Sequence, residues 1–148
     1  MKSFSVGLLL IGMSILGGCA SGPKFTEVKA AIPAVAPDQG RVYFYRSNSV
    51  FGAAIQPDIF LNGDKVGTSV PGGFFFVDRL PGDFQVSTTT EVEKQATFTL
   101  EKGQQRYIKT TISLGVLAGR VQPELIDPAT AEQELIESSY TGTLQLKK

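Results

Sequence analysis

One stretch of the sequence points to the fold more strongly than any other: Ile55-Gln56-Pro57-Asp58-Ile59-Phe60-Leu61-Asn62-Gly63-Asp64-Lys65-Val66-Gly67-Thr68-Ser69-Val70. Asn62-Gly63 stands between two apolar runs, and this dipeptide is a strong hairpin signal because both turn residues need positive φ. We therefore predict two antiparallel strands, 55–61 and 64–70, joined by a tight turn. Pro57 lacks an amide donor, so we expect its strand at a sheet edge or a bulge.

Period-two patterns continue on both sides of this hairpin. They predict further strands at 41–46, 74–77, 84–88, 96–100, 106–113 and 121–126, with Pro123 marking another edge or bulge. A helix follows: Asp127 caps it, Pro128 takes its first position, and residues 129–136 are mostly helix formers. We expect Leu135 and Ile136 to pack this helix against the rest of the domain. We therefore predict that residues 40–148 form an all-β, mainly antiparallel fold: a small immunoglobulin- or transthyretin-like β-sandwich with one short C-terminal helix.

Composition excludes several kinds of function. The 148 residues carry 14 basic and 14 acidic side chains, a net charge of zero, so no basic excess exists to bind nucleic acid. The chain has no His, no Trp and one Cys, which excludes a disulfide framework, a Cys/His zinc cluster and an imidazole base. We expect no metal, no cofactor and no enzymatic activity.

The first residues indicate export. Lys2 is followed by an uncharged apolar run of 13 residues, Phe4 to Leu16, which suits a signal peptide and is too short to span a bilayer. Leu16-Gly17-Gly18-Cys19 then resembles the bacterial lipobox. This resemblance implies cleavage of residues 1–18 and a covalent lipid (diacylglyceryl and palmitate chains) on Cys19. Ala20 after the cysteine, rather than Asp, implies an outer-membrane lipoprotein facing the periplasm.

Residues 19–39 are expected to be the lipidated Cys19 and a flexible tether. Pro23, Pro33 and Pro37 stand among small residues without a clean period. Such a segment tends toward polyproline II at ~3.1 Å per residue, which would lift the domain several nanometres off the membrane.

Two family resemblances are visible in the domain. The segments 60–67 and 80–86 resemble the PEGA-type repeat, a small β module of bacterial envelope proteins. A wider resemblance rests on the segments 41–46, 51–59, 74–78 and 115–120, which are similar to a bacterial lipoprotein family known only as a domain of unknown function. The resemblance implies export and a β fold, and it brings no activity or site residue.

Two loops, 50–54 and 114–119, lack charged side chains. If exposed together they would form a partner or ligand patch, whose candidate residues are Phe51, Leu114, Val116 and Leu117, with Arg46 and Arg120 at the rim to meet an anion. The alternative is that both loops cover one end of the sandwich and plug its core. For the two arginines, the alternative to an anion-binding rim is ordinary pairing with Asp58, Asp78 or Glu124.

Other side chains suggest rival functions. Asp58, Asp64, Asp78 and Asp83 could serve a carboxylate-dependent hydrolase, although their spacing demands no such pair. Tyr43 and Tyr45 could stack on cell-wall sugars or pack within the sheet. The first hypothesis is a non-catalytic periplasmic lipoprotein that binds or scaffolds an envelope or cell-wall partner; the alternatives are a carbohydrate or peptidoglycan binder and, less favoured, a hydrolase.

Overall fold

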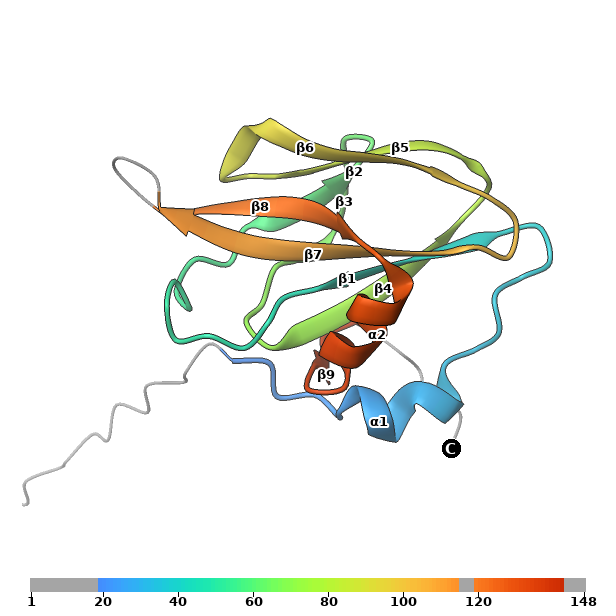
Figure 1. The fold of residues 1–148 in the computed structure, drawn as a ribbon, viewed down its shortest axis with the longest axis horizontal. Helices are drawn as coiled ribbons and strands as arrows, with labels where there is room; N and C mark the ends of the chain where they lie inside the picture. The colour runs from blue at the N-terminus through green and yellow to red at the C-terminus, as the bar shows by residue number, and fades with distance from the viewer. Residues whose placement is uncertain (1–18, 115–118, 143–148) are drawn as a thin grey trace, which may run out of the picture.

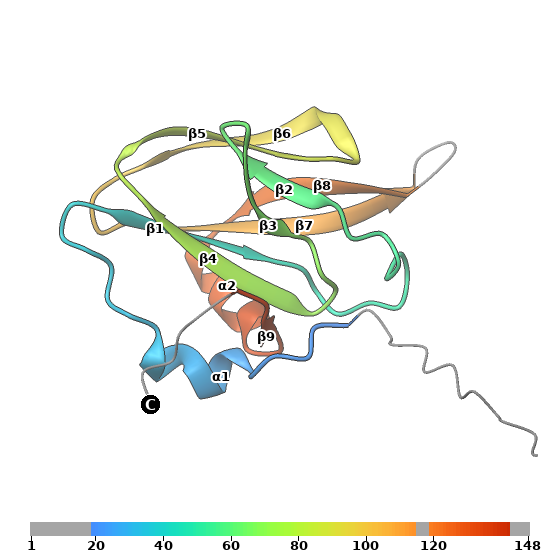
Figure 2. The same cartoon turned by 180° about the vertical axis from the view of Figure 1, so that it is seen from behind.

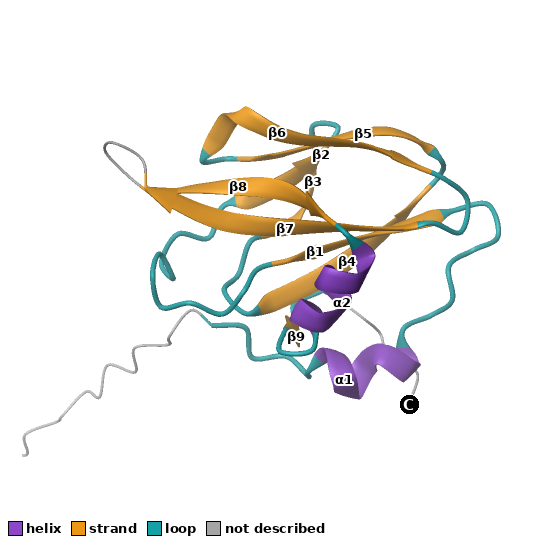
Figure 3. Ribbon diagram, in the orientation of Figure 1, coloured by secondary structure: helices purple, strands orange, loops and turns teal. Residues whose placement is uncertain are grey.

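The fold has three layers: two β-sheets face to face, and helices on the outer face of one of them (Figure 1). The computed structural model describes residues 19–114 and 119–142, without the side chains of 91–93. Figure 3 shows that strands dominate the described chain. The predicted sandwich with mainly antiparallel sheets and a short C-terminal helix is confirmed.

The sheet beside the helices has the strand order β8-β7-β1-β4-β9. Its pairs are antiparallel except β1 with β7 and β4 with β9, which are parallel. Its strands are β1 (Gly40–Tyr45), β4 (Gly73–Arg79), β7 (Gln105–Leu114), β8 (Gly119–Ile126) and β9 (Ser139–Tyr140). Pro123 lies in β8, an edge strand as predicted, where a missing amide interrupts no second ladder.

The other sheet has the order β3-β2-β5-β6 and is antiparallel throughout. Its strands are β2 (Asp58–Leu61), β3 (Asp64–Thr68), β5 (Gly82–Thr88) and β6 (Glu91–Leu100). Asn62 and Gly63 have φ of 49° and 85°, so the predicted tight hairpin is present. Pro57 lies just before β2, and β2 is an inner strand between β3 and β5. The prediction that Pro57 stands within an edge strand is wrong, because β2 begins only at Asp58; an irregularity in the β2–β3 register falls between Ile59 and Phe60. The PEGA-type relationship stays a prediction.

Alternation along β1 gives its sheet two buried faces. Val42 and Phe44 point into the core between the sheets, with Ile59, Leu61, Phe75, Val86, Leu100 and Ile108. Tyr43 and Tyr45 point to the other face, beneath the helices. This second cluster also contains Phe25, Val28, Phe74, Tyr107, Ala131 and Leu135. The sheet is therefore an internal layer of the molecule (Figure 2).

The C-terminal helix α2 (Pro128–Leu135) begins as predicted, with the Asp127 side chain accepting a hydrogen bond from the Thr130 amide at 3.0 Å. Leu135 is fully buried against the sheet. Ile136 is exposed, because the helix ends at Leu135 and the next side chain turns away from the sheet. The prediction that Ile136 docks the helix is wrong.

The expected tether is folded over much of its length. Residues Phe25–Val28 form α1 and Lys29–Ala31 form the 3-10 helix η1. Phe25 and Val28 are buried, and the Phe25 and Phe74 rings meet edge to face at 5.3 Å. The Glu27 carboxylate caps the start of α1 by accepting a hydrogen bond from the Lys24 amide at 2.8 Å. Phe25 and Val28 then pack on the outer face of the sheet. The prediction of a flexible spacer is wrong for these residues.

Candidate functional site

One end of the sandwich exposes apolar side chains from the two loops singled out in the sequence. Val50 is 94% exposed and Phe51 55%, both in the β1–β2 connection. Leu114, the last residue of β7, is 82% exposed. Val116 and Leu117 lie outside the described residues. We call Val50, Phe51 and Leu114 the apolar tip.

The two loops lie against each other at the apolar tip. Gly52 has a φ of +66° and touches the Ile112 side chain, which leaves no room for a Cβ atom. A Cβ atom at Gly119 would lie 2.6 Å from Cδ1 of Ile55. Both glycines therefore permit close approach between the β1–β2 connection and the β7–β8 hairpin. Ile55 is turned partly inward while Val50 and Phe51 face outward, so only part of the loop closes the core.

Arg46 holds the β1–β2 connection from inside. Its guanidinium is buried and donates to the carbonyl oxygens of Ile55 at 2.6 Å, Gly52 at 2.9 Å and Ser69 at 3.3 Å. Burial lowers the pKa of Arg46. The predicted role at an anion-binding rim is wrong, and so is the alternative of a carboxylate partner, because backbone carbonyls occupy these donors.

Arg120 stays at the exposed end of the sandwich. It stands opposite Ser113 in the β7–β8 register, one position from Leu114 and Gly119. Arg120 is exposed to solvent. The structure thus separates the two predicted rim arginines: one is internal and the other lies beside the apolar tip.

The start of the described chain reaches the same end. The Ala20 amide donates to the carbonyl of Pro71 at 3.1 Å, and Cys19 is exposed. A Cβ atom at Gly72 would lie 3.2 Å from Cβ of Asn48, two residues before Val50. These contacts place Cys19 on the same side of the molecule as the β1–β2 connection. The described chain contains no helix that is long and apolar enough to cross a membrane.

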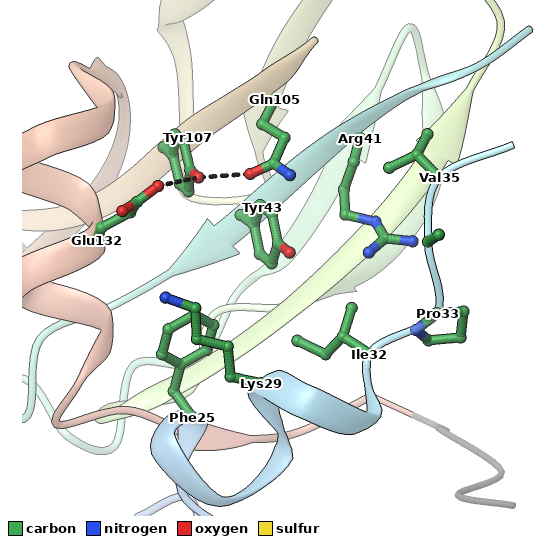
Figure 4. Close-up of a pocket in the computed structure, with 11 residues that line it drawn as sticks. Phe25, Lys29, Ile32, Pro33, Val35, Arg41, Tyr43, Gln105, Tyr107 and Glu132 are labelled. Carbon is green, nitrogen blue, oxygen red and sulfur yellow. Dashed lines mark hydrogen bonds between the residues drawn. The ribbon is translucent and has the colours of Figure 1, made fainter. Parts of the chain in front are cut away.

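A cleft that sequence reasoning missed lies under η1, between it, the sheet and α2 (Figure 4). Its volume is about 240 Å³, which is below the usual range of ~300–1,000 Å³ for small-molecule sites. Its polar lining is Lys29, Arg41, Tyr43, Gln105, Tyr107 and Glu132. It was missed because Lys29 belongs to the segment expected to be a tether, and no local pattern predicts where such a segment docks.

One of the two cationic side chains that line this cleft, Arg41, is already engaged. Arg41 forms two hydrogen bonds to Asp78, at 2.6 and 2.8 Å, and lies 4.2 Å from the centre of the Phe76 ring. Burial acts to lower the pKa of Arg41, but Asp78 and Tyr43 outweigh it and the pKa is raised. The pairing is structural, and it opposes use of Arg41 to bind an anion.

The tyrosines form no exposed platform for sugars. Tyr43 is buried and stacks on Tyr107, with ring centres 5.2 Å apart. Tyr45 is buried too and donates to Glu134 of α2 at 2.6 Å. Burial, followed by the neighbouring carboxylates, raises the pKa of Tyr45 and Tyr107. These rings serve packing, which was the alternative to sugar stacking.

The candidate carboxylates are occupied or dispersed. Asp78 binds Arg41, Asp58 binds Lys65 at 2.9 Å, and Asp83 accepts from the Thr99 hydroxyl at 2.7 Å. Asp64 lies exposed at the start of β3. Within the described ranges no cluster of three potential metal ligands occurs.

Comparison with known proteins agrees with the sequence resemblance. A model of the family described as "Protein of unknown function (DUF2846)" matches residues 36–121, from just before β1 to the start of β8. An uncharacterized protein of Haemophilus influenzae (strain ATCC 51907 / DSM 11121 / KW20 / Rd) is 27% identical over 123 residues, 79% of this chain and 73% of the relative. No solved structure matches. The family match covers more than half of the sequence, and the chain therefore belongs to the DUF2846 family.

Proposed function

We propose that this protein is a bacterial envelope lipoprotein: a non-catalytic β-sandwich, acylated at Cys19, that binds or scaffolds at a membrane surface. The observation that carries the proposal is the position of Cys19. It ends a lipobox-like sequence, Leu16-Gly17-Gly18-Cys19, and stands exposed one residue before the first backbone contact of the folded domain.

This position suits lipid processing. Cleavage before Cys19 removes none of the helices and strands given above, so the domain keeps all of its described contacts. An exposed thiol leaves space for a diacylglyceryl group. Each buried methylene contributes about 0.8 kcal/mol to membrane binding, and two or more chains give stable attachment. The choice of membrane follows the sorting rule for lipoproteins: Ala20 after the cysteine, rather than Asp, favours the outer membrane with the domain in the periplasm.

A binding role is favoured over catalysis by the side chains that the fold gathers. Asp58 and Asp78, two of the candidate acids, are tied to Lys65 and Arg41. The apolar tip carries Val50 and Leu114, the two most exposed large hydrophobic side chains among the described residues, and exposed apolar side chains that lie together mark contact surfaces.

Acylation is tested by producing the full chain in a Gram-negative host and feeding it a clickable fatty acid. The intact mass of the purified protein should begin at Cys19 and include the lipid. Cys19→Ser should abolish labelling, whereas the matched change Ser21→Ala, outside the lipobox, should keep it. Retention of Met1, or an unmodified sulfur at Cys19, would contradict the proposal.

Sorting is tested separately by fractionating inner and outer membranes. The wild-type protein should be found in the outer membrane, and Ala20→Asp should move it to the inner membrane while acylation persists. Wild-type protein in the inner membrane would remove the assignment to the outer membrane and leave the lipid anchor standing, whereas both proteins in the outer membrane would show that Ala20 does not decide the sorting.

A further inference from the structure

We infer that the apolar tip, Val50, Phe51 and Leu114, is a membrane-docking surface that inserts into the bilayer holding the acyl chains. The inference rests on the proposed acylation of Cys19 and specifies what the contact surface touches. Its occupant is the lipid bilayer itself, at the level of the headgroups and upper acyl chains.

The anchor leaves almost no spacer between lipid and domain. The Ala20 amide is bound to Pro71, the Pro23 carbonyl accepts from the Tyr140 amide at 2.8 Å, and the Phe25 amide donates to Ser138 at 2.9 Å. Consecutive Cα atoms are about 3.8 Å apart, so an acylated Cys19 lies within one residue of the folded surface. Whatever surrounds Pro71 is consequently held against the headgroups.

A continuous path of contacts leads from this anchor to the apolar tip. Gly72, next to Pro71, lies against Asn48, and Val50 follows two residues later. Gly52 then touches Ile112, from which Leu114 is two residues away along β7. In Figure 1 the start of the described chain, the β1–β2 connection and the open end of β7 and β8 all lie toward the left side of the molecule.

The chemistry of this end suits lipid contact. Six large hydrophobic side chains are exposed among the described residues, and the two most exposed, Val50 and Leu114, are both here. The segments 46–57, 69–77 and 110–123 contain no Asp or Glu, so no carboxylate in them opposes approach to a membrane. Apolar side chains at the tip would gain free energy in proportion to the area they remove from water.

The tip is also held in place before it meets lipid. Arg46 binds three carbonyls of the neighbouring backbone, including those of Gly52 and Ile55, and the Gln56 side chain donates to Ala53 at 3.1 Å. Because these contacts order the loop in advance, docking loses little conformational entropy. Strand β6, which lies next to β8, begins with Glu91 and also contains Glu93. The docking we infer therefore depends on apolar contact and requires no anionic lipid.

The test uses the full acylated chain with single cysteines that carry a nitroxide spin label. Cys19 is the only natural cysteine, so acylation leaves an introduced thiol as the only labelling site. Val50→Cys and Leu114→Cys report on the tip. Leu80→Cys is the matched control, because Leu80 is also an exposed leucine but lies in the β4–β5 turn, at the other end of β4 from Gly73.

The labelled proteins are reconstituted in vesicles of zwitterionic phosphatidylcholine, with no other protein present. Labels at 50 and 114 should lose access to a water-soluble relaxation agent several-fold and gain access to oxygen, while the label at 80 stays fully accessible. Adding Val50→Asp and Leu114→Asp to a Phe51→Cys protein should restore aqueous access at 51.

The outcomes separate the inference from the proposed function. Labels at 50 and 114 that are as accessible as the label at 80 would overturn membrane docking and leave the tip to a protein partner. Failure of acylation is seen independently, since the wild-type protein would then take up the label at Cys19.

Discussion

The two faces of the β8-β7-β1-β4-β9 sheet are both buried, yet they are built differently. The inner face, with Val42 and Phe44, meets the second sheet through apolar side chains. The outer face, with Tyr43 and Tyr45, is covered by α1, η1 and α2, and its hydroxyls bond to carboxylates such as Glu134. The two faces of β1 therefore have different roles: the inner face packs against the second sheet, and the outer face packs against α1, η1 and α2.

This division bears on function. The covering layer on the outer face includes the segment that begins at Cys19, so the docking of α1 sets where the proposed lipid stands relative to the domain. We therefore expect the loss of α1 to affect the outer face more than the inner core.

Phe44→Ala should cause the largest loss, about 3–5 kcal/mol, because it leaves a cavity in a fully buried, stacked site beside Phe75. Thermal and urea unfolding of the domain measure it. The matched control is Phe51→Ala at the exposed tip, which should shift stability by less than about 0.5 kcal/mol. Similar losses of unfolding free energy for Phe44→Ala and Phe51→Ala would show that packing on the inner face contributes no more to stability than the exposed tip does.

Phe25→Ala should cost less, about 2 kcal/mol, because α1 is short and its neighbours can close the gap better than a sandwich core can. Hydrogen exchange should speed up at the Phe25 and Val28 amides while β1 stays protected. Thr26→Ala, exposed in the same helix, is the control and should leave exchange unchanged. Equal loss of protection in β1 would contradict the separation of the two faces.

Tyr45→Phe should cost about 1–2 kcal/mol, because it removes the hydroxyl that donates to Glu134 from a buried ring. Glu134 also accepts from Lys109 at 2.7 Å, so Glu134→Gln should lose more than Tyr45→Phe does. A double-mutant cycle of the two changes should give a clear coupling energy. Gln133→Ala, exposed on the same helix, should be neutral.

Stability should fall in acid through the outer face. Burial acts to raise the pKa of Glu134, but Lys109 and Tyr45 outweigh it and hold the pKa below its ordinary 4.5. A carboxyl with a lowered folded pKa stabilises the fold above its unfolded pKa, and that stability is lost as pH falls through the folded pKa. Unfolding free energy should thus decline below about pH 4.5, and Glu134→Gln should flatten the decline. An unchanged pH dependence of the unfolding free energy in Glu134→Gln would show that Glu134 does not cause the loss of stability in acid.

Val50→Asp with Leu114→Asp should have the smallest effect on folding, within about 0.5 kcal/mol, because both side chains stand in solvent. Thermal unfolding in the absence of lipid checks this. In vesicles, the same pair of changes should make the label at residue 51 fully accessible to the water-soluble relaxation agent. A large loss of stability would mean that the tip plugs the core.

Local sequence signals were strong where neighbours along the chain decide the structure. Asn62-Gly63 predicted its hairpin, and Asp127-Pro128 predicted the start of α2. The apolar loops were recognised because they lack charge, and Val50, Phe51 and Leu114 are indeed exposed. Arg46 was misjudged, because backbone carbonyls that accept from a side chain leave no mark in the sequence.

Residue types and short spacings were enough to predict the class of fold, the turns, the cap of α2 and the apolar character of the two loops. Three features became visible only in the folded chain: residues 25–31 pack on the sheet, Arg41 binds Asp78, and the Ala20 amide binds the Pro71 carbonyl. These outcomes depend on contacts between residues far apart in the chain: a short segment such as α1 becomes ordered only when a distant surface buries its two apolar side chains.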